Sequence, residues 1–321
     1  MGRIVFLGDA NLDLVLRVAG LPPMGGEVEA AGGETRIGGC AVNAARWASW
    51  LGEEAVLWAR IGGDLPGDRL AGELRSQGID LRYLQRDPAL PTGLVVVLVG
   101  REGERTMISL PGANRALEVE GIEGIGASLL YVSGYSLLRK WAPVLKAMVS
   151  CRARGVIVVL DPGPLLPEEK LAEAIPVVDA VLGGIRELGG RPERLLELGV
   201  PEVVVKLGAA GCRYISPGKE FHIPAYPLGV PEDTTGAGDA FGAGYVCGLL
   251  GGLSPEARCL LGGLLGALAA TGALPPAVPR EKAEELMGRL MRLRPDLSPH
   301  LEEVRGFLRR RDPWRSGGSS G

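Results

Sequence analysis

Short apolar runs alternate with helical stretches along most of the chain, and this pattern restricts the fold more than any other feature. A strand that is apolar throughout must be buried on both faces, because an exposed face would place polar residues at every second position. Strands of this kind, joined by helices, predict a mostly parallel sheet with helices on both sides. The predicted strands are 4–7, 55–61, 129–132, 156–160, 180–182 and 203–207. The sequence therefore predicts a three-layer α/β protein.

Two segments interrupt this alternation, because each holds strand-like residues with no helix between them. Residues 28–37 and 93–109 both predict pairs of strands, and the polar stretch 101–104 predicts the hairpin turn of the second pair. We interpret these segments as a small β-lid inserted into the α/β body. The predicted units are the body at 1–10, 40–91 and 115–315, the β-lid at 11–39 and 92–114, and a flexible tail at 316–321.

The overall charge and composition narrow the range of partners. The net charge is −3 and basic residues are scattered, so we expect no nucleic-acid partner. No apolar run has the length needed to cross a bilayer, and the first residues lack the apolar core of a signal peptide, so we expect a cytoplasmic protein without a membrane partner. The five cysteines are far apart and form no CxxC pair, which is typical of buried thiols in a reducing compartment.

The segment DTTGAGDAFGAGY, residues 233–245, places four glycines around one acidic residue just before a long apolar run. Turn and cap residues come first, and residues 240–250 predict a helix. The unpaired N–H groups and the dipole of a first helical turn bind anions, and glycines let an oxyanion approach the backbone closely. Asp239 follows this turn directly. A carboxylate at such a site fits phosphoryl transfer, in which it accepts the proton of the attacking hydroxyl.

Two common phosphate-binding motifs do not match this chain. A Walker loop requires Gly-Lys followed by Ser or Thr, whereas the Gly-Lys pair of this chain is followed by Glu220. The dinucleotide fingerprint GxGxxG fails at its last position, where Phe241 stands, so an NAD-binding enzyme is nearly excluded. One alternative remains for the glycine-rich segment, a helix whose glycines let it pack closely on a neighbour. His222 and His300 have no partner motif and are not expected to be catalytic.

Several motifs resemble those of the ribokinase-like (PfkB) family of carbohydrate kinases. Residues 233–245 closely match its C-terminal signature, and residues 38–43 (GGCAVN) match its N-terminal signature. Residues 112–114 (GAN) and 207–211 (LGAAG) are also familiar in this family. The similarity runs from about residue 4 to about residue 279, nearly the whole chain. The resemblance implies a doubly wound, mostly parallel sheet with a β-lid, and a kinase that uses ATP and Mg²⁺.

The resemblance also implies roles for individual residues of the sugar site. Asp239 is implied to be the base that takes the proton from the sugar hydroxyl, and the amides of Gly236, Ala237 and Gly238 are implied to form an anion hole. The residues implied to bind the sugar are Asn11, Asp13, Gly38, Gly39 and Asn43. A carboxylate such as that of Asp13 can accept hydrogen bonds from two hydroxyls.

The nucleotide and its metal ion are implied to bind at the ends of later strands. The residues implied to contact the nucleotide are Lys206, Gly208 and Gly211. Glu187 is implied to hold water around Mg²⁺, and Asp161 is a second acidic group at a strand end. This chain has Gly184 where the family usually has asparagine, which either loosens the placement of metal or phosphate or is compensated by Arg186.

Two further expectations concern a monovalent cation and subunit pairing. By resemblance, Asp233 and Thr235 match positions that can hold a monovalent cation such as K⁺, with more ligands near 269–272. Residues 94–99 are apolar at every position, so both faces of this lid strand need a cover. The sugar pocket can cover one face and a second subunit the other. We therefore expect a homodimer that pairs through the β-lid.

Three functions remain open at the level of the sequence. The first is phosphorylation of a primary hydroxyl of a small sugar such as ribose, fructose or a related sugar. The second is a nucleoside kinase, in which the ribose still meets Asp13 while a base fills the lid. The third is a sugar-binding regulator without turnover, which the missing asparagine favours and the intact Asp239 opposes.

Overall fold

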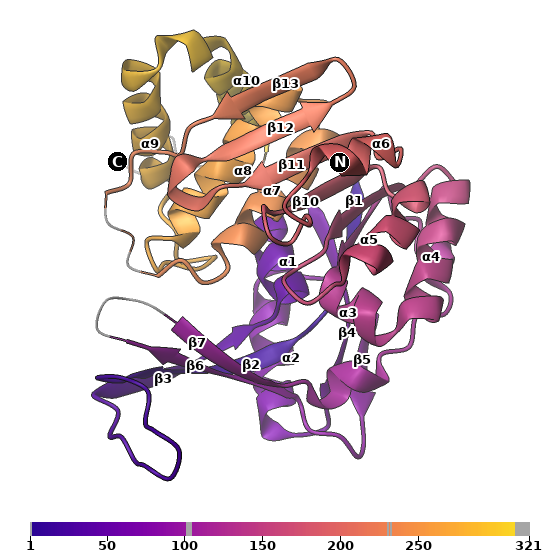
Figure 1. The fold of residues 1–321 in the computed structure, drawn as a ribbon, viewed down its shortest axis with the longest axis vertical. Coiled ribbons are helices and arrows are strands. Elements are labelled where there is room, and N and C mark those ends of the chain that lie inside the picture. Colours follow the sequence, from indigo (N-terminus) through magenta and orange to yellow (C-terminus); the bar gives the residue numbers. More distant parts are fainter. Residues whose placement is uncertain (1, 101–104, 230, 232, 312–321) are drawn as a thin grey trace.

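The computed structural model describes residues 2–100, 105–229, 231 and 233–311. Among these residues, nine strands form one large sheet in the order β13-β12-β11-β10-β9-β8-β1-β4-β5 (Figure 1). Neighbours from β5 to β11 are parallel, whereas β12 and β13 form an antiparallel edge. The strands are β1 (Arg3–Leu7), β4 (Glu54–Gly62), β5 (Leu84–Asp87), β8 (Leu129–Ser133), β9 (Ile157–Asp161), β10 (Ala180–Gly184), β11 (Glu202–Lys206), β12 (Cys212–Ser216) and β13 (Lys219–Ile223). The predicted parallel sheet is confirmed.

Helices cover both faces of this sheet, which gives the predicted three layers (Figure 1). Alternate residues of β1 enter different cores, because successive side chains of a strand point to opposite faces: Ile4 and Phe6 join one, Val5 and Leu7 the other. The first core is completed by α1 (Cys40–Trp50), α2 (Leu65–Ser76), α7 (Ala237–Leu250), α8 (Pro255–Ala269), α9 (Arg280–Leu293) and α10 (Ser298–Arg309). The second is completed by α3 (Gly134–Arg139), α4 (Trp141–Ala153), α5 (Glu168–Ala174) and α6 (Glu193–Glu197).

A second, four-stranded sheet has the order β3-β2-β6-β7 and extends from one side of the body (Figure 1). Its strands are β2 (Asn11–Arg17), β3 (Gly32–Gly38), β6 (Gly93–Val99) and β7 (Arg105–Leu110). We refer to these four strands as the β-lid. The expected hairpin of β6 and β7 is confirmed, while its turn at 101–104 lies outside the described residues. The strand pair expected within 28–37 is wrong, because β3 is a single strand whose antiparallel partner is β2.

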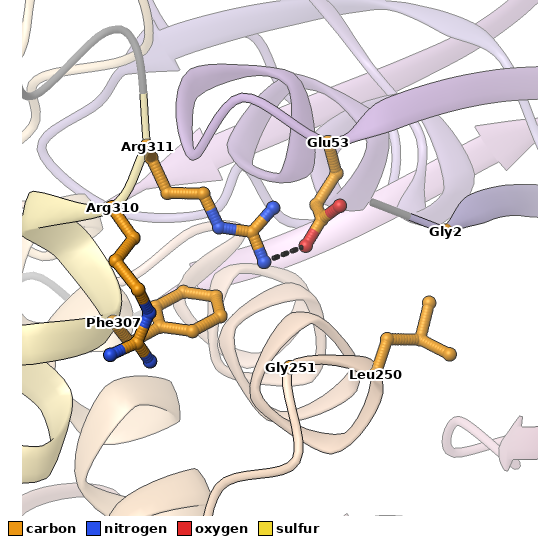
Figure 2. Close-up of a pocket in the computed structure, with 7 residues that line it drawn as sticks. All are labelled: Gly2, Glu53, Leu250, Gly251, Phe307, Arg310 and Arg311. Atoms are coloured by element: carbon orange, nitrogen blue, oxygen red, sulfur yellow. Dashed lines mark ion pairs between the residues drawn. The ribbon is translucent and has the colours of Figure 1, made fainter.

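Different residues lie at the two ends of the parallel strands. Asp9, Asp161 and Lys206 lie at or just beyond the carboxyl ends of β1, β9 and β11, so they gather on that side of the sheet. At the amino ends of β1 and β4, a cavity of about 320 Å³ lies between the end of α7 and the end of α10. Figure 2 shows Glu53 and Arg311 paired in this cavity, with 2.6 Å between Oε1 and Nη2. This buried pair fixes the end of α10 against the start of β4.

Two expectations drawn from composition can be compared with the structure. Within the described residues, which include all five cysteines, no disulfide is formed, and four of the thiols are buried, as predicted for core thiols. Among the described residues, no helix combines the length and the apolar character that crossing a bilayer would require.

Candidate active site

The glycine-rich segment begins α7 earlier than the sequence predicts. Gly236 is the residue before the helix and has a φ of 73°, a left-handed conformation that favours glycine. Ala237 and Gly238 therefore lie in the first helical turn, whose N–H groups point out of the helix end. The Ala237 N–H donates to the Thr234 carbonyl at 3.2 Å. Within the described residues, the amides of Gly236 and Gly238 are not bonded in this way, so they are the ones that can face an anion.

Asp239 lies in the same turn and points to a cavity between the body and the β-lid. Its Oδ2 accepts a hydrogen bond from the Asn43 amide nitrogen at 2.8 Å. Burial raises the pKa of Asp239 to about 7, while the hydrogen bond from Asn43 opposes the shift and the negative charge of Asp161 adds to it. A carboxylate with this pKa is partly ionised near neutral pH and can accept a proton.

Asp13 extends from β2 toward the same cavity. A side chain at Gly38 would place its Cβ 2.1 Å from Asp13 Oδ2, so the close approach of β3 requires a glycine there. Burial raises the pKa of Asp13 to about 7, the charge of Asp239 adds to this shift, and Arg36 opposes it. Asp13 Oδ1 is buried without a hydrogen-bond partner among the described residues. An acceptor left in this state is suited to a hydroxyl of a bound ligand.

Asn11 is fixed by Asn114, whose motif has no assigned role at the level of the sequence. Asn114 donates to Asn11 Oδ1 at 2.8 Å and to the Pro111 carbonyl at 2.9 Å, and accepts from the Ala10 N–H at 3.0 Å. Asn114 is 3% exposed, so these bonds are formed in the interior. Asn114 thus orients Asn11 at the cavity wall. Gly39, at the start of α1, has a φ of 102°, and a Cβ there would meet the Asp9 carbonyl at 2.3 Å.

The cavity between body and β-lid has a volume of about 200 Å³. It gathers seven of the residues named from the sequence: Asn11, Asp13, Gly39, Asn43, Thr235, Gly236 and Asp239. The β-lid contributes an apolar wall of Val95, Val97 and Met107. Residues from distant parts of the chain are therefore brought to one cavity, which makes it the candidate active site.

Sequence reasoning missed a charged pair in the wall of this cavity. Arg139 Nη1 lies 2.6 Å from both carboxylate oxygens of Asp9, and the Ser136 hydroxyl donates to Asp9 at 3.3 Å. The Arg139 guanidinium also lies over the ring of Tyr135, 5.6 Å from its centroid. The two partners are 130 residues apart, so no local pattern in the sequence links Arg139 to Asp9.

Lys206 lies beside the anion hole, at the end of β11. Its Nζ is 3.4 Å from the position that a Cβ would take at Gly238, and it donates to Asp161 Oδ2 at 2.9 Å. Burial alone would lower the pKa of Lys206, but the charges of Asp161, Glu187 and Asp239 together with the hydrogen bond to Asp161 outweigh it, and the pKa rises to about 12. Tyr131 donates to the same Asp161 oxygen at 2.9 Å. Lys206 is therefore a fixed positive charge beside the first turn of α7.

Gly208 and Gly211 form the turn that joins β11 to β12, directly after Lys206. Gly211 has a φ of 92°, and a Cβ there would lie 2.0 Å from the Ile223 carbonyl oxygen. Gly208 has a φ of 58° with open space around it. The backbone at Gly208 is therefore open, whereas Gly211 is packed against the end of β13.

Glu187 is held at the end of β10 by the backbone. Its Oε2 accepts a hydrogen bond from the Gly184 N–H at 2.6 Å. A Cβ at Gly184 would lie 3.5 Å from Glu187, an ordinary contact, so the asparagine that the resemblance implies at this position would have room for its Cβ. Among the described residues, no group of three His, Cys, Asp or Glu side chains is arranged to hold a metal ion. A single carboxylate such as Glu187 suits Mg²⁺ that is held mainly by water and phosphate.

Asp233 is already bound to donors on both carboxylate oxygens. Arg36 Nη1 donates to Oδ2 at 2.7 Å, the Thr235 N–H donates to Oδ1 at 2.8 Å, and Arg105 Nη2 forms an ion pair with Oδ1 at 2.8 Å. Burial acts to raise the pKa of Asp233, but the hydrogen bonds from Thr235 and Arg36 and the charge of Arg105 lower it overall. The donor set expected for a monovalent cation therefore does not fit, since its only carboxylate faces two positive charges.

Comparison with known proteins agrees with this geometry. The family model described as "pfkB family carbohydrate kinase" matches residues 1–275. A ribokinase of Arabidopsis thaliana is 29% identical over 277 residues, 80% of this chain and 73% of that protein. The structure of Arabidopsis thaliana ribokinase with ribose and ATP is 25% identical with a TM-score of 0.77, and the match covers 89% of this chain and 98% of that one.

Two further relatives differ in the names of their substrates. An ATP-dependent ribose-1-phosphate kinase of Halopiger xanaduensis is 30% identical over 253 residues, 77% of this chain and 84% of that protein. A nucleoside kinase of Burkholderia thailandensis, solved with inosine, shares the fold with a TM-score of 0.77 at 19% identity, over 88% of this chain and 95% of that one. The chain therefore belongs to the pfkB family of carbohydrate kinases and is a phosphotransferase.

Proposed function

We propose that this kinase transfers the γ-phosphoryl group of ATP to a primary hydroxyl of a small sugar such as ribose, fructose or a related sugar. One observation carries the proposal. Asp239, with a pKa near 7, faces the same cavity as Asp13, whose buried oxygen lacks a partner within the described residues, and it stands at the start of helix α7. A base, a hydroxyl acceptor and an anion site thus surround one small volume.

In the proposed reaction, Asp13 and Asn11 bind sugar hydroxyls, and Asp239 accepts the proton of the attacking hydroxyl. The sugar oxygen forms the new bond to phosphorus while the bond to the ADP oxygen breaks. The amides of Gly236 and Gly238, with the fixed charge of Lys206, stabilise the charge on the moving phosphoryl group. The turn with Gly208 and Gly211 borders the nucleotide. Mg²⁺ bound to ATP would neutralise phosphate charge, and Glu187 is placed to hold its water shell.

A nucleoside is the second candidate substrate, because the cavity wall formed by the β-lid is apolar. Val95, Val97 and Met107 offer a surface on which a base could pack while the ribose meets Asp13. A regulator without turnover is the least favoured, since Asp239, Asn43 and Lys206 keep an arrangement that phosphoryl transfer requires.

The test is ATP turnover by the purified protein with a panel of acceptors: ribose, deoxyribose, fructose, ribose 1-phosphate, adenosine and inosine. We expect the highest kcat/KM with a free sugar. Asp239→Asn should keep ATP affinity and lower kcat by about 10²–10⁴-fold, the usual effect of losing a general base. Wild-type turnover in that variant would overturn the role of Asp239. No turnover with any acceptor would overturn the proposed function itself.

We also propose that the β-lid pairs two subunits. The face of the lid that looks away from the cavity carries Leu14 of β2, Val96 of β6 and Ile108 of β7, which lie in one row across the sheet. Ile108 is 61% exposed. An apolar sheet face is stable when another sheet covers it, and a second lid of the same shape would do so.

A further inference from the structure

The β-lid is tied to the body at one carboxylate, that of Asp233. Arg36 and Arg105 lie on β3 and β7, which are the two edge strands of the lid. Their guanidinium groups nevertheless converge on Asp233 from opposite edges, at 2.7 and 2.8 Å. The three side chains are only 18–22% exposed, so the contact is partly shielded from solvent.

Asp233 in turn fixes the loop that leads into the anion hole. Its Oδ1 accepts the Thr235 N–H, one residue before Gly236 begins the turn. Its backbone forms a parallel bridge with Thr271, which lies in the loop after α8. A shift of Asp233 would therefore move the start of the anion hole, and the lid arginines restrain that shift.

A monovalent cation at this loop would have to share Asp233 with the two arginines. A carboxylate offers about four acceptor positions. Two of them accept the N–H groups of Arg36 and Thr235, and the Arg105 guanidinium forms an ion pair with Oδ1. Arg36 and Arg105 are both positively charged, so a third cation would be repelled at short range in a shielded place. The charge that balances Asp233 is thus supplied by the chain itself.

We propose that Arg36 and Arg105 take the place of a monovalent cation at Asp233, so that the anion-hole loop is held by the β-lid and catalysis needs no K⁺. They are positioning residues, since they act on the anion hole through Asp233. This inference rests on the proposed kinase reaction. It predicts that lid closure and the order of the anion-hole loop are coupled.

The first test compares the wild-type protein in K⁺, Na⁺ and tetramethylammonium chloride at equal ionic strength. We expect the same kcat and the same Tm in all three salts. A severalfold activation by K⁺, with a rise in Tm that is specific to K⁺, would overturn the proposal. The Tm needs no substrate, so this arm stays informative even if no sugar is phosphorylated and the proposed function fails.

The second test removes the two guanidinium groups with the double variant Arg36→Ala/Arg105→Ala. We expect kcat to fall about tenfold or more in tetramethylammonium, because a charge-assisted hydrogen bond and an ion pair are lost. K⁺ should now raise both kcat and Tm, since Asp233 is freed to bind it. Arg17→Ala is the matched control, because Arg17 is an exposed lid arginine at the end of β2 that does not contact Asp233.

Two results would contradict the role of the arginines: wild-type turnover in the double variant, or a loss of turnover that is equal in Arg17→Ala. If the double variant fails to fold, the single variants Arg36→Lys and Arg105→Lys keep a positive charge and are expected to retain K⁺ independence. Hydrogen exchange gives a readout apart from turnover. The amides of β6 and β7 should lose protection in the double variant and keep it in the control.

Discussion

At the scale of single residues, the protonation of Asp239 sets the expected pH dependence of turnover. Its pKa is raised to about 7 by burial, and the base acts only when it is deprotonated. The rate should therefore rise with pH through about 7 and level off above it. A pH profile of kcat/KM with saturating ATP measures this. Between about pH 5 and pH 8, histidines and groups with a shifted pKa are the side chains that titrate. A flat profile over this interval would contradict the role of Asp239 as the base.

We expect Asp13 to favour sugar binding and to lower the stability of the folded protein above neutral pH. Its folded pKa of about 7 lies above the usual value near 4, so the folded state holds a proton that the unfolded state releases in between. Stability is therefore lost as pH rises from about 4 to about 7. Asp13→Asn removes this loss, so its Tm should exceed that of the wild type at about pH 8 but not at about pH 4. Its sugar KM should rise about tenfold or more, because hydrogen bonds to a charged acceptor are lost.

These two results together distinguish a binding residue from a solvated one. A variant with unchanged KM and unchanged Tm at both pH values would show that Asp13 is an ordinary surface acid. Unfolding followed by calorimetry at each pH, without sugar or ATP, gives the Tm.

The sequence reveals those site residues that lie within local motifs and misses those that are defined by a distant partner. Asp239 is predicted because the glycines around it mark the start of a helix, and Asn43 and Asp13 because they match motifs of the family that the chain resembles. Arg139 and Arg105 could not be predicted, because each pairs with an acid in a distant part of the chain and arginines are common along it. Ion pairs of this kind depend on the folded arrangement of elements, which no local pattern encodes.

At the scale of elements, the four glycines of 233–245 serve two purposes. Gly236 and Gly238 belong to the turn that faces the cavity. Gly242 and Gly244 lie deeper in α7 and allow close packing: a Cβ at Gly244 would lie 2.7 Å from the Leu261 carbonyl of α8. Close packing of a helix on its neighbour, which the sequence leaves open as an alternative, thus describes the second half of the segment.

Gly244→Ala tests this packing. The added methyl group meets the backbone of α8, so we expect a loss of about 1–3 kcal/mol in the free energy of unfolding. Gly288→Ala is the matched control, since Gly288 is also inside a helix, α9, and its Cβ would meet only the ends of arginine side chains, the nearest being Arg292 at 3.6 Å. That change should stabilise the protein by about 0.5–1 kcal/mol. Denaturant unfolding of both variants compares them, and equal effects would contradict the packing role of Gly244.

Strand pairing shows where prediction at this scale stops. The large sheet follows from short apolar runs joined by helices, because that pattern has few other solutions. Within the β-lid, the sequence predicts a pair of strands at 28–37, whereas β3 pairs with β2 across an intervening segment. Which residues of such a segment form a strand depends on the strand with which it pairs. Residue propensity does not distinguish a pairing within residues 28–37 from a pairing with β2.

At the scale of the whole molecule, the outer face of the β-lid gives a test of subunit pairing. Ile108→Lys places a charge in the apolar row, so a dimer formed there should dissociate. Leu293→Lys is the control, because Leu293 is 66% exposed at the end of α9, away from the lid. Sedimentation at low micromolar protein should show a dimer for the wild type and the control and a monomer for Ile108→Lys. A monomeric wild type would exclude this pairing.

The contact between α7 and Tyr131 affects how mutations across the whole chain would be read. A Cβ at Gly242 would lie 2.3 Å from the Tyr131 hydroxyl, the same hydroxyl that bonds Asp161 beside Lys206. A side chain at Gly242 would thus displace the residues around Lys206, to which we assign a role in binding phosphate, without touching substrate. In a saturation screen scored by growth or turnover, Gly242 would be indistinguishable from a catalytic position. A substitution screen of this enzyme distinguishes structural positions from catalytic positions only if the yield of folded protein and the nucleotide affinity are measured for every variant.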